Sequence, residues 1–143
     1  RIFVVVLIIV GLYSTINKIS QNSRKNQIVK VSNDTVIGCA ETVVSKLLRA
    51  PSQARWYDTE VLDHDQYGRY LVHLDVDAMN GFGGYEKAGY LVIIYNVTKD
   101  GHFTYNTANG AFPLFNSNYT DTSIDNAKQL NDWGKSIEND SEP

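Results

Sequence analysis

Cysteine is almost absent from this sequence, and its scarcity limits the chemistry that the chain can carry. Cys39 is the only cysteine among 143 residues, so these residues can form neither an internal disulfide nor a zinc site built from several cysteines. No Gly-x-Ser-x-Gly, His-Glu-x-x-His or paired-cysteine motif occurs either. Cys39 has no histidine at helical spacing, which favours a packing role over that of a nucleophile. The sequence therefore predicts that the protein is not an enzyme and carries no cofactor.

Acidic residues are missing from the first 30 positions, and this divides the charge of the chain into two parts. Residues 1–30 carry five basic residues and no acid, whereas the rest of the chain carries 8 basic and 16 acidic residues. An acidic folded part argues against nucleic acid as a partner, because phosphate binding needs a cationic surface. The basic stretch suits the headgroup region of a membrane instead. Basic residues directly after a span would place the folded part in the cytoplasm by the positive-inside rule, unless the segment before Arg1 carries more of them.

Charge is also absent from the apolar run IFVVVLIIVGLYSTI, which begins at Ile2. Its fifteen residues fall short of the roughly 20 that cross a bilayer, so we interpret it as a truncated transmembrane segment. A signal-peptide core is the alternative, but no small-x-small cleavage site follows it. The predicted organisation is a membrane segment at 1–17, a basic polar stem at 18–31, one folded domain at 32–137 and a disordered tail at 138–143.

Apolar residues then recur at helical spacing in SNDTVIGCAETVVSKLLRAP. This spacing predicts an amphipathic helix over about 34–50, capped by Ser32, Asn33 or Asp34 and ended by Pro51. Its valines are poor helix formers in isolation, so we expect the helix to be stabilised by packing its apolar stripe on a sheet.

Strand patterns follow this helix. In RYLVHLDVDA (69–78) apolar residues alternate with polar ones, which is typical of a strand with one buried and one wet face. The run AGYLVIIYNV (88–97) is apolar on both faces and is predicted to be central. A first strand is predicted at 54–62, and an Asp-Gly turn leads into a further strand at 102–107. Asp63, His64 and Asp65 fall in the intervening turn, where we expect solvated charges rather than a general base.

The predicted fold class is α+β. It consists of an N-terminal membrane helix and then one amphipathic helix packed on a three- to four-stranded antiparallel meander sheet. Residues 108–120 are predicted to form a loop, and a short C-terminal helix is predicted with its cap near Thr122 or Ser123.

The glycine-rich stretch VDAMNGFGGY (76–85) is interpreted as a shaped turn between two strands. Asparagine and glycine adopt positive φ readily, as a tight reversal requires. We expect Asp77 or Asn80 to bond the backbone of the loop. A phosphate cradle is excluded because GFGG is followed by neither a helix nor a lysine–hydroxyl pair. The predicted turn residues are Asp77, Asn80, Gly81, Gly83 and Gly84.

A metal site is the alternative interpretation of the same region. Asp75, Asp77 and Glu86 stand at positions 1, 3 and 12 of a calcium-loop template, but positions 5 and 6 lack the residues that the template needs. His73, Asp75 and Asp77 share a strand face at a spacing of about 7 Å, so they would meet at a transition metal only if the strand bent. The simpler interpretation is the solvated face of an edge strand.

Aromatic residues predict a contact surface. Trp56, Phe82 and Tyr85 are candidates for binding a protein or glycan partner, because rigid aromatic side chains beside polar residues make good contacts. Self-association of the helix-on-sheet unit is a further expectation.

Two stretches resemble a known family. LLRAPSQARW (47–56) and YLVHLDVDAMNGFG (70–83) match the pattern Ser-Pro-Ser-x-Ala-x-aromatic, then Val-Asp-Ala-x-Asn-x-aromatic-Gly, of a small domain in bacterial membrane-anchored proteins and lipoproteins. The match covers about residues 39–97, with Ala50 and Trp56 standing where the family often has serine and phenylalanine. Family members often carry a cytoplasmic zinc ribbon before the membrane span, which would place the domain outside.

The resemblance implies an envelope location and no catalytic activity, and it supplies no site. We therefore expect a membrane-tethered, extracytoplasmic binding or assembly module of a bacterial envelope. The alternative is a metal-dependent module or enzyme that uses His73, Asp75, Asp77 and Glu86.

Overall fold

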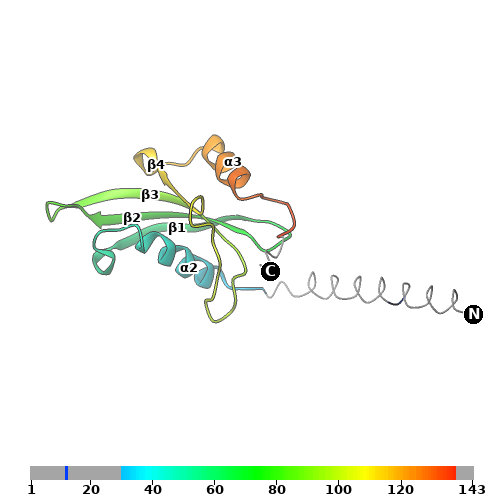
Figure 1. Ribbon diagram of the computed structural model, residues 1–143. Coiled ribbons are helices and arrows are strands. Elements are labelled where there is room, and N and C mark those ends of the chain that lie inside the picture. Colours follow the sequence, from blue (N-terminus) through cyan, green and yellow to red (C-terminus); the bar gives the residue numbers. More distant parts are fainter. Residues whose placement is uncertain (1–11, 13–29, 138–143) are drawn as a thin grey trace, which may run out of the picture.

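The fold is an antiparallel sheet with a helix on each face (Figure 1). The computed structural model describes residue 12 and residues 30–137. The elements in chain order are α2 (Asn33–Ser45), η1 (Pro51–Gln53), β1 (Arg55–His64), β2 (Tyr70–Met79), β3 (Tyr85–Ile94), β4 (Ala111–Leu114), η2 (Phe115–Ser117) and α3 (Asp121–Leu130). The predicted α+β class with an antiparallel sheet is confirmed.

Three predicted segments lie outside the described residues. They are the membrane segment, except for residue 12, the stem up to residue 29 and the tail from 138 onward. Within the part of the chain that the structure describes, no helix has the length and apolar character needed to span a membrane.

The four strands lie in space in the order β1-β2-β3-β4. β2 and β3 pair along their whole length, from Tyr70 with Ile94 to Met79 with Tyr85. The prediction that the apolar run of β3 is central is confirmed, because β2 and β4 flank it. β2 is central as well, so the edge-strand interpretation of its polar face is wrong.

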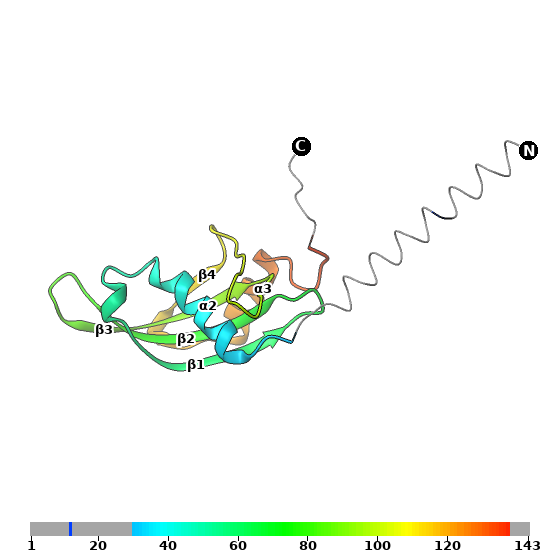
Figure 2. The same cartoon turned by 90° about the horizontal axis from the view of Figure 1, so that it is seen from below.

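Helix α2 covers one face of the sheet (Figures 1 and 2). The Ser32 hydroxyl accepts a hydrogen bond from the Thr35 amide at 3.2 Å, which caps the first turn. The helix ends at Ser45, earlier than predicted, because the Lys46 amide bonds back to the last turn and the chain leaves the helix before Pro51. Its buried side packs on alternate residues of β2 and β3, including Val72, Leu74, Val92 and Ile94.

The tail of the domain covers the other face. Residues 111–114, predicted to be loop, form the fourth strand, whereas residues 102–107 contribute only the single bridge between Tyr95 and Thr104. Pro113 is tolerated in β4 because this strand pairs with β3 alone and is an edge. Helix α3 then packs Ala127 against a second core cluster that contains Leu71, Leu91 and Ile93.

The cap of α3 lies two to three residues before the predicted position. Thr120 and Ser123 form a capping box, in which the Ser123 amide donates to the Thr120 hydroxyl and the Thr120 amide donates to the Ser123 hydroxyl at 2.7 Å. Two of the amides that have no partner within the helix are thereby satisfied, and the helix starts at Asp121.

An ion pair between Lys128 and Asp63 joins α3 to β1, and it lowers the pKa of the Asp63 carboxyl. The Lys128 ammonium donates to the Asp63 carboxylate at 2.6 Å, and this hydrogen bond holds the pKa of Asp63 below its ordinary value. A lowered folded-state pKa stabilises the fold above the ordinary carboxyl value, and this contribution is lost as the pH falls through the lowered pKa. In Lys128→Met, we expect the pKa of Asp63, measured by carboxyl NMR titration, to rise. An unchanged pKa would contradict the pairing.

Candidate functional site

The polar face of β2 is buried, not wet. His73 is 6% exposed and Asp75 is 5% exposed, because Tyr119 packs on His73 and η2 lies over the neighbouring strand β3. Gly89 permits this approach. It stands opposite Asp75 in the register, and a Cβ on Gly89 would lie 2.6 Å from the Ser117 Cα and 2.9 Å from Asp75 Oδ1.

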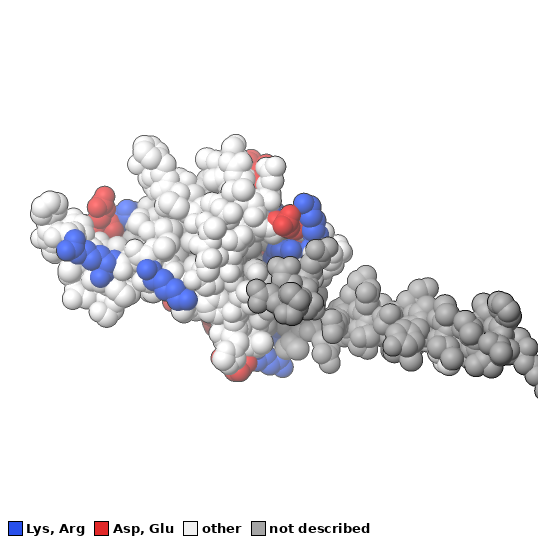
Figure 3. All heavy atoms as spheres, in the orientation of Figure 1, with Lys and Arg blue, Asp and Glu red and all other residues white. Residues whose placement is uncertain are grey.

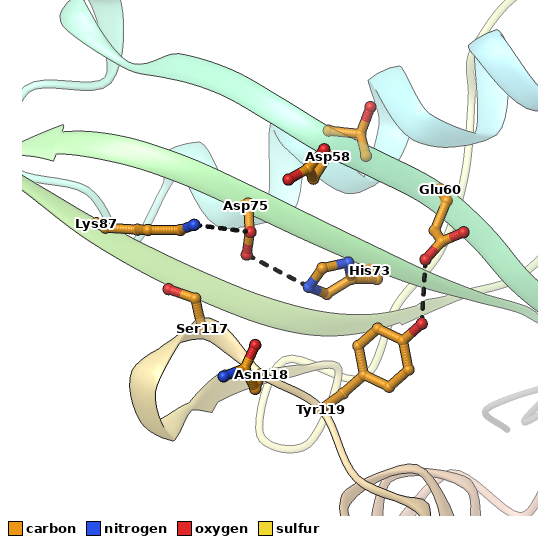
Figure 4. A pocket seen from close by; sticks show the side chains of 9 residues that line it. Asp58, Glu60, His73, Asp75, Lys87, Ser117, Asn118 and Tyr119 are labelled. Carbon is orange, nitrogen blue, oxygen red and sulfur yellow. Dashed lines mark hydrogen bonds and ion pairs between the residues drawn. The ribbon is translucent and has the colours of Figure 1, made fainter.

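A pocket of about 600 Å³ opens beside the buried pair (Figure 4). In the close-up, residues of β1 lie on one side of His73 and Asp75, and the segment from Ser117 to Tyr119 lies on the other. We call this the His73/Asp75 pocket. Its lining residues are Asp58, Thr59, Glu60, His73, Asp75, Lys87, Ser117, Asn118 and Tyr119.

Two polar atoms at the base of the pocket have no hydrogen-bond partner. They are His73 Nε2 and Asp75 Oδ1. The two atoms lie 3.3 Å apart, which is a close contact, but they are not aligned for a hydrogen bond. An unpaired buried polar group costs about 1–3 kcal/mol, so a packed core would not retain this pair. His73 and Asp75 both line the pocket, so these two enclosed atoms are the candidate contacts for a ligand.

The backbone on both sides of the pocket adopts unfavourable conformations. Asp58 has φ 45°, and the consecutive residues Asn116 and Ser117 have φ 54° and 61°. Positive φ in residues other than glycine is uncommon and stores strain that the surrounding structure must offset. Strain of this kind concentrates at ligand sites, and here it flanks the unpaired histidine and aspartate.

The strain at Asp58 belongs to a β-bulge that selects which residue faces the pocket. Tyr57 pairs with Asp75, but Glu60, not Thr59, pairs with His73. One extra residue in β1 therefore moves Glu60 onto the face of His73, since paired residues of neighbouring strands share a face.

A hydrogen bond and a ring contact hold Tyr119 at the rim of the His73/Asp75 pocket. The Tyr119 hydroxyl donates to Glu60 Oε1 at 3.1 Å, and its ring packs edge-on against His73 at a centroid distance of 4.7 Å. The bond to the Glu60 carboxylate, together with burial, raises the pKa of Tyr119 above its ordinary value. The hydroxyl therefore remains a donor at neutral pH, and it holds the β1 side of the rim to the segment after η2.

Lys87 completes the rim without occupying the base of the pocket. Its ammonium lies 3.6 Å from Asp75 Oδ2 and 4.8 Å from the centre of the Tyr57 ring. The Lys87 side chain is 54% exposed, and Oδ1, the other oxygen of Asp75, stays unpaired.

A serine, a histidine and an aspartate meet here, but not in the order of a catalytic triad. In a triad the imidazole lies between the nucleophile and the carboxylate. In Figure 4, Asp75 lies between Ser117 and His73, and it is the imidazole and carboxylate that are in contact at 3.3 Å. A triad also contains an imidazole–carboxylate contact, but within the described residues no hydrogen bond joins His73 to the Ser117 hydroxyl.

The four residues of the alternative metal interpretation do not gather at one point. His73 and Asp75 meet, whereas the Asp77 carboxylate accepts a hydrogen bond from the Tyr57 hydroxyl at 3.3 Å. Glu86 pairs with Ala78 and so lies on the α2 face, opposite to His73. Across residue 12 and residues 30–137, no group of three or more His, Cys, Asp or Glu side chains is arranged to hold a metal ion.

The glycine-rich stretch connects β2 to β3. Asn80 Oδ1 accepts hydrogen bonds from the amides of Phe82 and Gly84, both at 3.0 Å. Gly83 has φ +83°, and Gly81 lies against the side chain of Arg49. Asn80 is thus the residue that bonds the loop's backbone, while Asp77 belongs to β2 and bonds elsewhere.

The aromatic residues predicted as a contact surface do not form one surface. Trp56 pairs with Val76 and packs on the α2 side, whereas Tyr85 pairs with Met79 and lies on the opposite face under the Arg55 guanidinium. Phe82 is fully exposed in the connection between β2 and β3. This connection lies at the end of the sheet away from the start of α2 (Figures 1 and 2). Figure 3 shows several lysine and arginine side chains toward the same end of the molecule.

Sequence reasoning missed most of the pocket. Asp58, Glu60 and Lys87 had no pattern to mark them, and Ser117 to Tyr119 fell in a predicted loop. One signal was present: Gly89 interrupts an otherwise apolar strand, and a glycine inside a strand often marks the close approach of another backbone. Comparisons of the chain with protein-family models, with curated proteins and with solved structures find no match.

Proposed function

We propose that this chain is a non-catalytic binding module that takes a small polar ligand in the His73/Asp75 pocket. The observation that carries the proposal is a pair of buried atoms without hydrogen-bond partners, His73 Nε2 and Asp75 Oδ1, on two residues that line the pocket. A volume of about 600 Å³ falls in the range of small-molecule sites. The strained backbone at Asp58 and Ser117 adds support from both walls.

The proposal predicts that some class of small polar molecule shifts the NMR signals of the pocket. The full chain in detergent would be titrated with amines, saccharides, carboxylates, calcium and zinc, each to millimolar concentration. We expect at least one class to shift the amide signals of Ser117, Asn118 and Tyr119, while those of Gly81 and Gly83 stay in place. If none of the five classes moves the pocket signals, the binding function is wrong.

We further propose that the module is tethered to a bacterial membrane by residues 1–17 and lies outside the cytoplasm. The apolar run and the basic stretch behind it support the tether. The family resemblance alone supports the position outside, because basic residues directly after a span favour the cytoplasmic side. In fractionated cells, we expect the full chain to stay with the membranes after a high-salt wash and to be cut by protease added from outside. Recovery in the soluble fraction would contradict the tether, and protection from protease would contradict the orientation.

A further inference from the structure

The charges that line the His73/Asp75 pocket are unequal. Three carboxylates, those of Asp58, Glu60 and Asp75, face one ammonium, that of Lys87. Opposite charges attract strongly where water is partly excluded, so the lining favours a cation over an anion. Lys87 does not meet this demand alone, because it approaches only Asp75 Oδ2 and lies at the rim.

The unpaired atoms require a donor. Asp75 Oδ1 is an acceptor, and His73 Nε2 is also an acceptor when the ring proton is on Nδ1. The two atoms lie 3.3 Å apart and are themselves enclosed, so a small movement of the side chains around them would let one donor group bond both. An alkylammonium carries three N–H donors, which can bond Asp75 Oδ1, His73 Nε2 and a carboxylate on β1 together.

The walls suit the carbon chain that carries such a group. The Tyr119 ring stands against His73 and is anchored through its hydroxyl to Glu60. Aromatic rings attract organic cations and pack against their methylene groups. Tyr57 already holds the Lys87 ammonium near its ring at 4.8 Å on the same face of the sheet.

We propose that the His73/Asp75 pocket binds a primary ammonium group on an unbranched alkyl chain. This inference rests on the proposed binding function and names the class of its ligand. Such a group is carried both by a free small amine and by a lysine side chain of a partner protein.

The test uses pairs of probes with the same kind of alkyl chain, in which one member ends in an ammonium group and the other is neutral. Pentylamine and Nα-acetyl-lysine-N-methylamide supply the ammonium as a free amine and as a lysine side chain, and pentanol and Nα-acetyl-norleucine-N-methylamide are the matched neutral compounds. The readout is the imidazole C–H signals of His73 in the full chain. His64 and His102 are exposed and lie outside the pocket lining, so their signals serve as internal controls.

We expect both ammonium probes, and neither neutral probe, to shift His73. Tighter binding of pentylamine would assign a free amine, and tighter binding of the lysine derivative would assign a partner's side chain. Asp75→Asn should weaken the binding at least about tenfold, the loss typical of a hydrogen bond to a charged group. Because Asp75 is buried, Glu60→Gln at the exposed rim is a second variant, and we expect a weakening of several-fold. Asp100→Asn, which removes an exposed carboxylate outside the pocket, should change nothing.

The outcomes separate this inference from the function on which it rests. If the neutral probes shift His73 as much as the ammonium probes, or if Asp75→Asn and Glu60→Gln both bind pentylamine like the parent chain, the ammonium inference is wrong. If saccharides, carboxylates or metal ions move His73 and amines do not, the ammonium inference is wrong while the binding function stands. If no compound moves His73 or the amides of Ser117 to Tyr119, both are wrong.

Discussion

Replacing Asp65 by alanine is expected to lower the free energy of unfolding by about 3–5 kcal/mol. Asp65 is 7% exposed and its partner Arg69 is 6% exposed, and their side chains meet at 3.0 Å. Removing one member of a buried ion pair leaves the other charge uncompensated away from water, which is among the most destabilising changes a single substitution makes.

The carboxylate of Asp65 also satisfies backbone amides from two parts of the chain. Oδ1 accepts from the amides of Tyr67 and Arg69 at 2.9 Å, and Oδ2 accepts from the Gly134 amide at 3.0 Å. Arg69 in turn donates to the Lys135 carbonyl at 2.6 Å. Asp65 therefore fixes the β1–β2 turn and joins it to the segment after α3, so the alanine variant loses both connections.

Urea unfolding of the full chain measures this loss. The matched control is Asp100→Ala. Asp100 and its partner His102 lie 3.3 Å apart and are both exposed, and exposed pairs contribute little to stability because water screens them. The double variant Asp65→Leu with Arg69→Leu should recover part of the loss, since it removes the unpaired charge. A loss in Asp65→Ala no larger than that of the control would show that the network contributes little to stability.

Asp65 also shows where reasoning from local sequence fails. It was expected to be a solvated turn charge, because acids in the run DHDQYG usually face water. It is buried because Gly134, 69 residues later, closes over it. A pattern that spans ten residues reports local conformation and cannot report which distant segment covers the turn.

Strand β2 shows the same contrast between what a local pattern predicts and what distant segments decide. The alternation in RYLVHLDVDA correctly separates the two faces of β2, with Val72 and Leu74 toward α2 and His73 and Asp75 opposite. The alternation could not show whether the polar face would be open, since that depends on the segment from Phe115 to Tyr119. Periodicity identifies the face of a side chain, and tertiary packing decides whether that face is wet.

The sequence predicts a loop over 108–120 for a physical reason. Its strand is short and contains Pro113, which removes a backbone donor and lowers the strand signal. The edge position makes this tolerable, because the unpaired side of β4 needs no donor. The pocket was missed with the strand, since η2 follows β4 directly and supplies Ser117.

Replacing Gly89 by alanine is expected to lower the free energy of unfolding by about 1–3 kcal/mol, as overpacking a close contact does. The added Cβ would meet the Cα and carbonyl oxygen of Ser117 at 2.6 and 2.9 Å. Both are backbone atoms, so neither can rotate away as a side chain would. Ser117 already has φ 61°, and further displacement would have to move the whole segment after β4.

Gly38→Ala is the matched control in the same chain. A Cβ on Gly38 meets nothing within 4 Å, and the residue lies inside α2, where alanine favours the helix by about 1 kcal/mol over glycine. The same chemical change should therefore stabilise the protein at one glycine and destabilise it at the other. If urea unfolding shows the two variants to be equally stable, Ser117 does not press on β3 as described.

The Gly89 substitution tests the pocket as well as the core. Lifting Ser117 from β3 would also move Tyr119 from the His73 ring, which it now contacts at a centroid distance of 4.7 Å. We therefore expect the imidazole signals of His73 to lose the ring-current shift from Tyr119 in Gly89→Ala and to keep it in Gly38→Ala. A stability loss without this spectral change would mean that the strand adapts while the cover stays in place. The free energy of unfolding and the His73 signals together would show whether a glycine at position 89 is needed for the segment from Ser117 to Tyr119 to form one wall of the His73/Asp75 pocket.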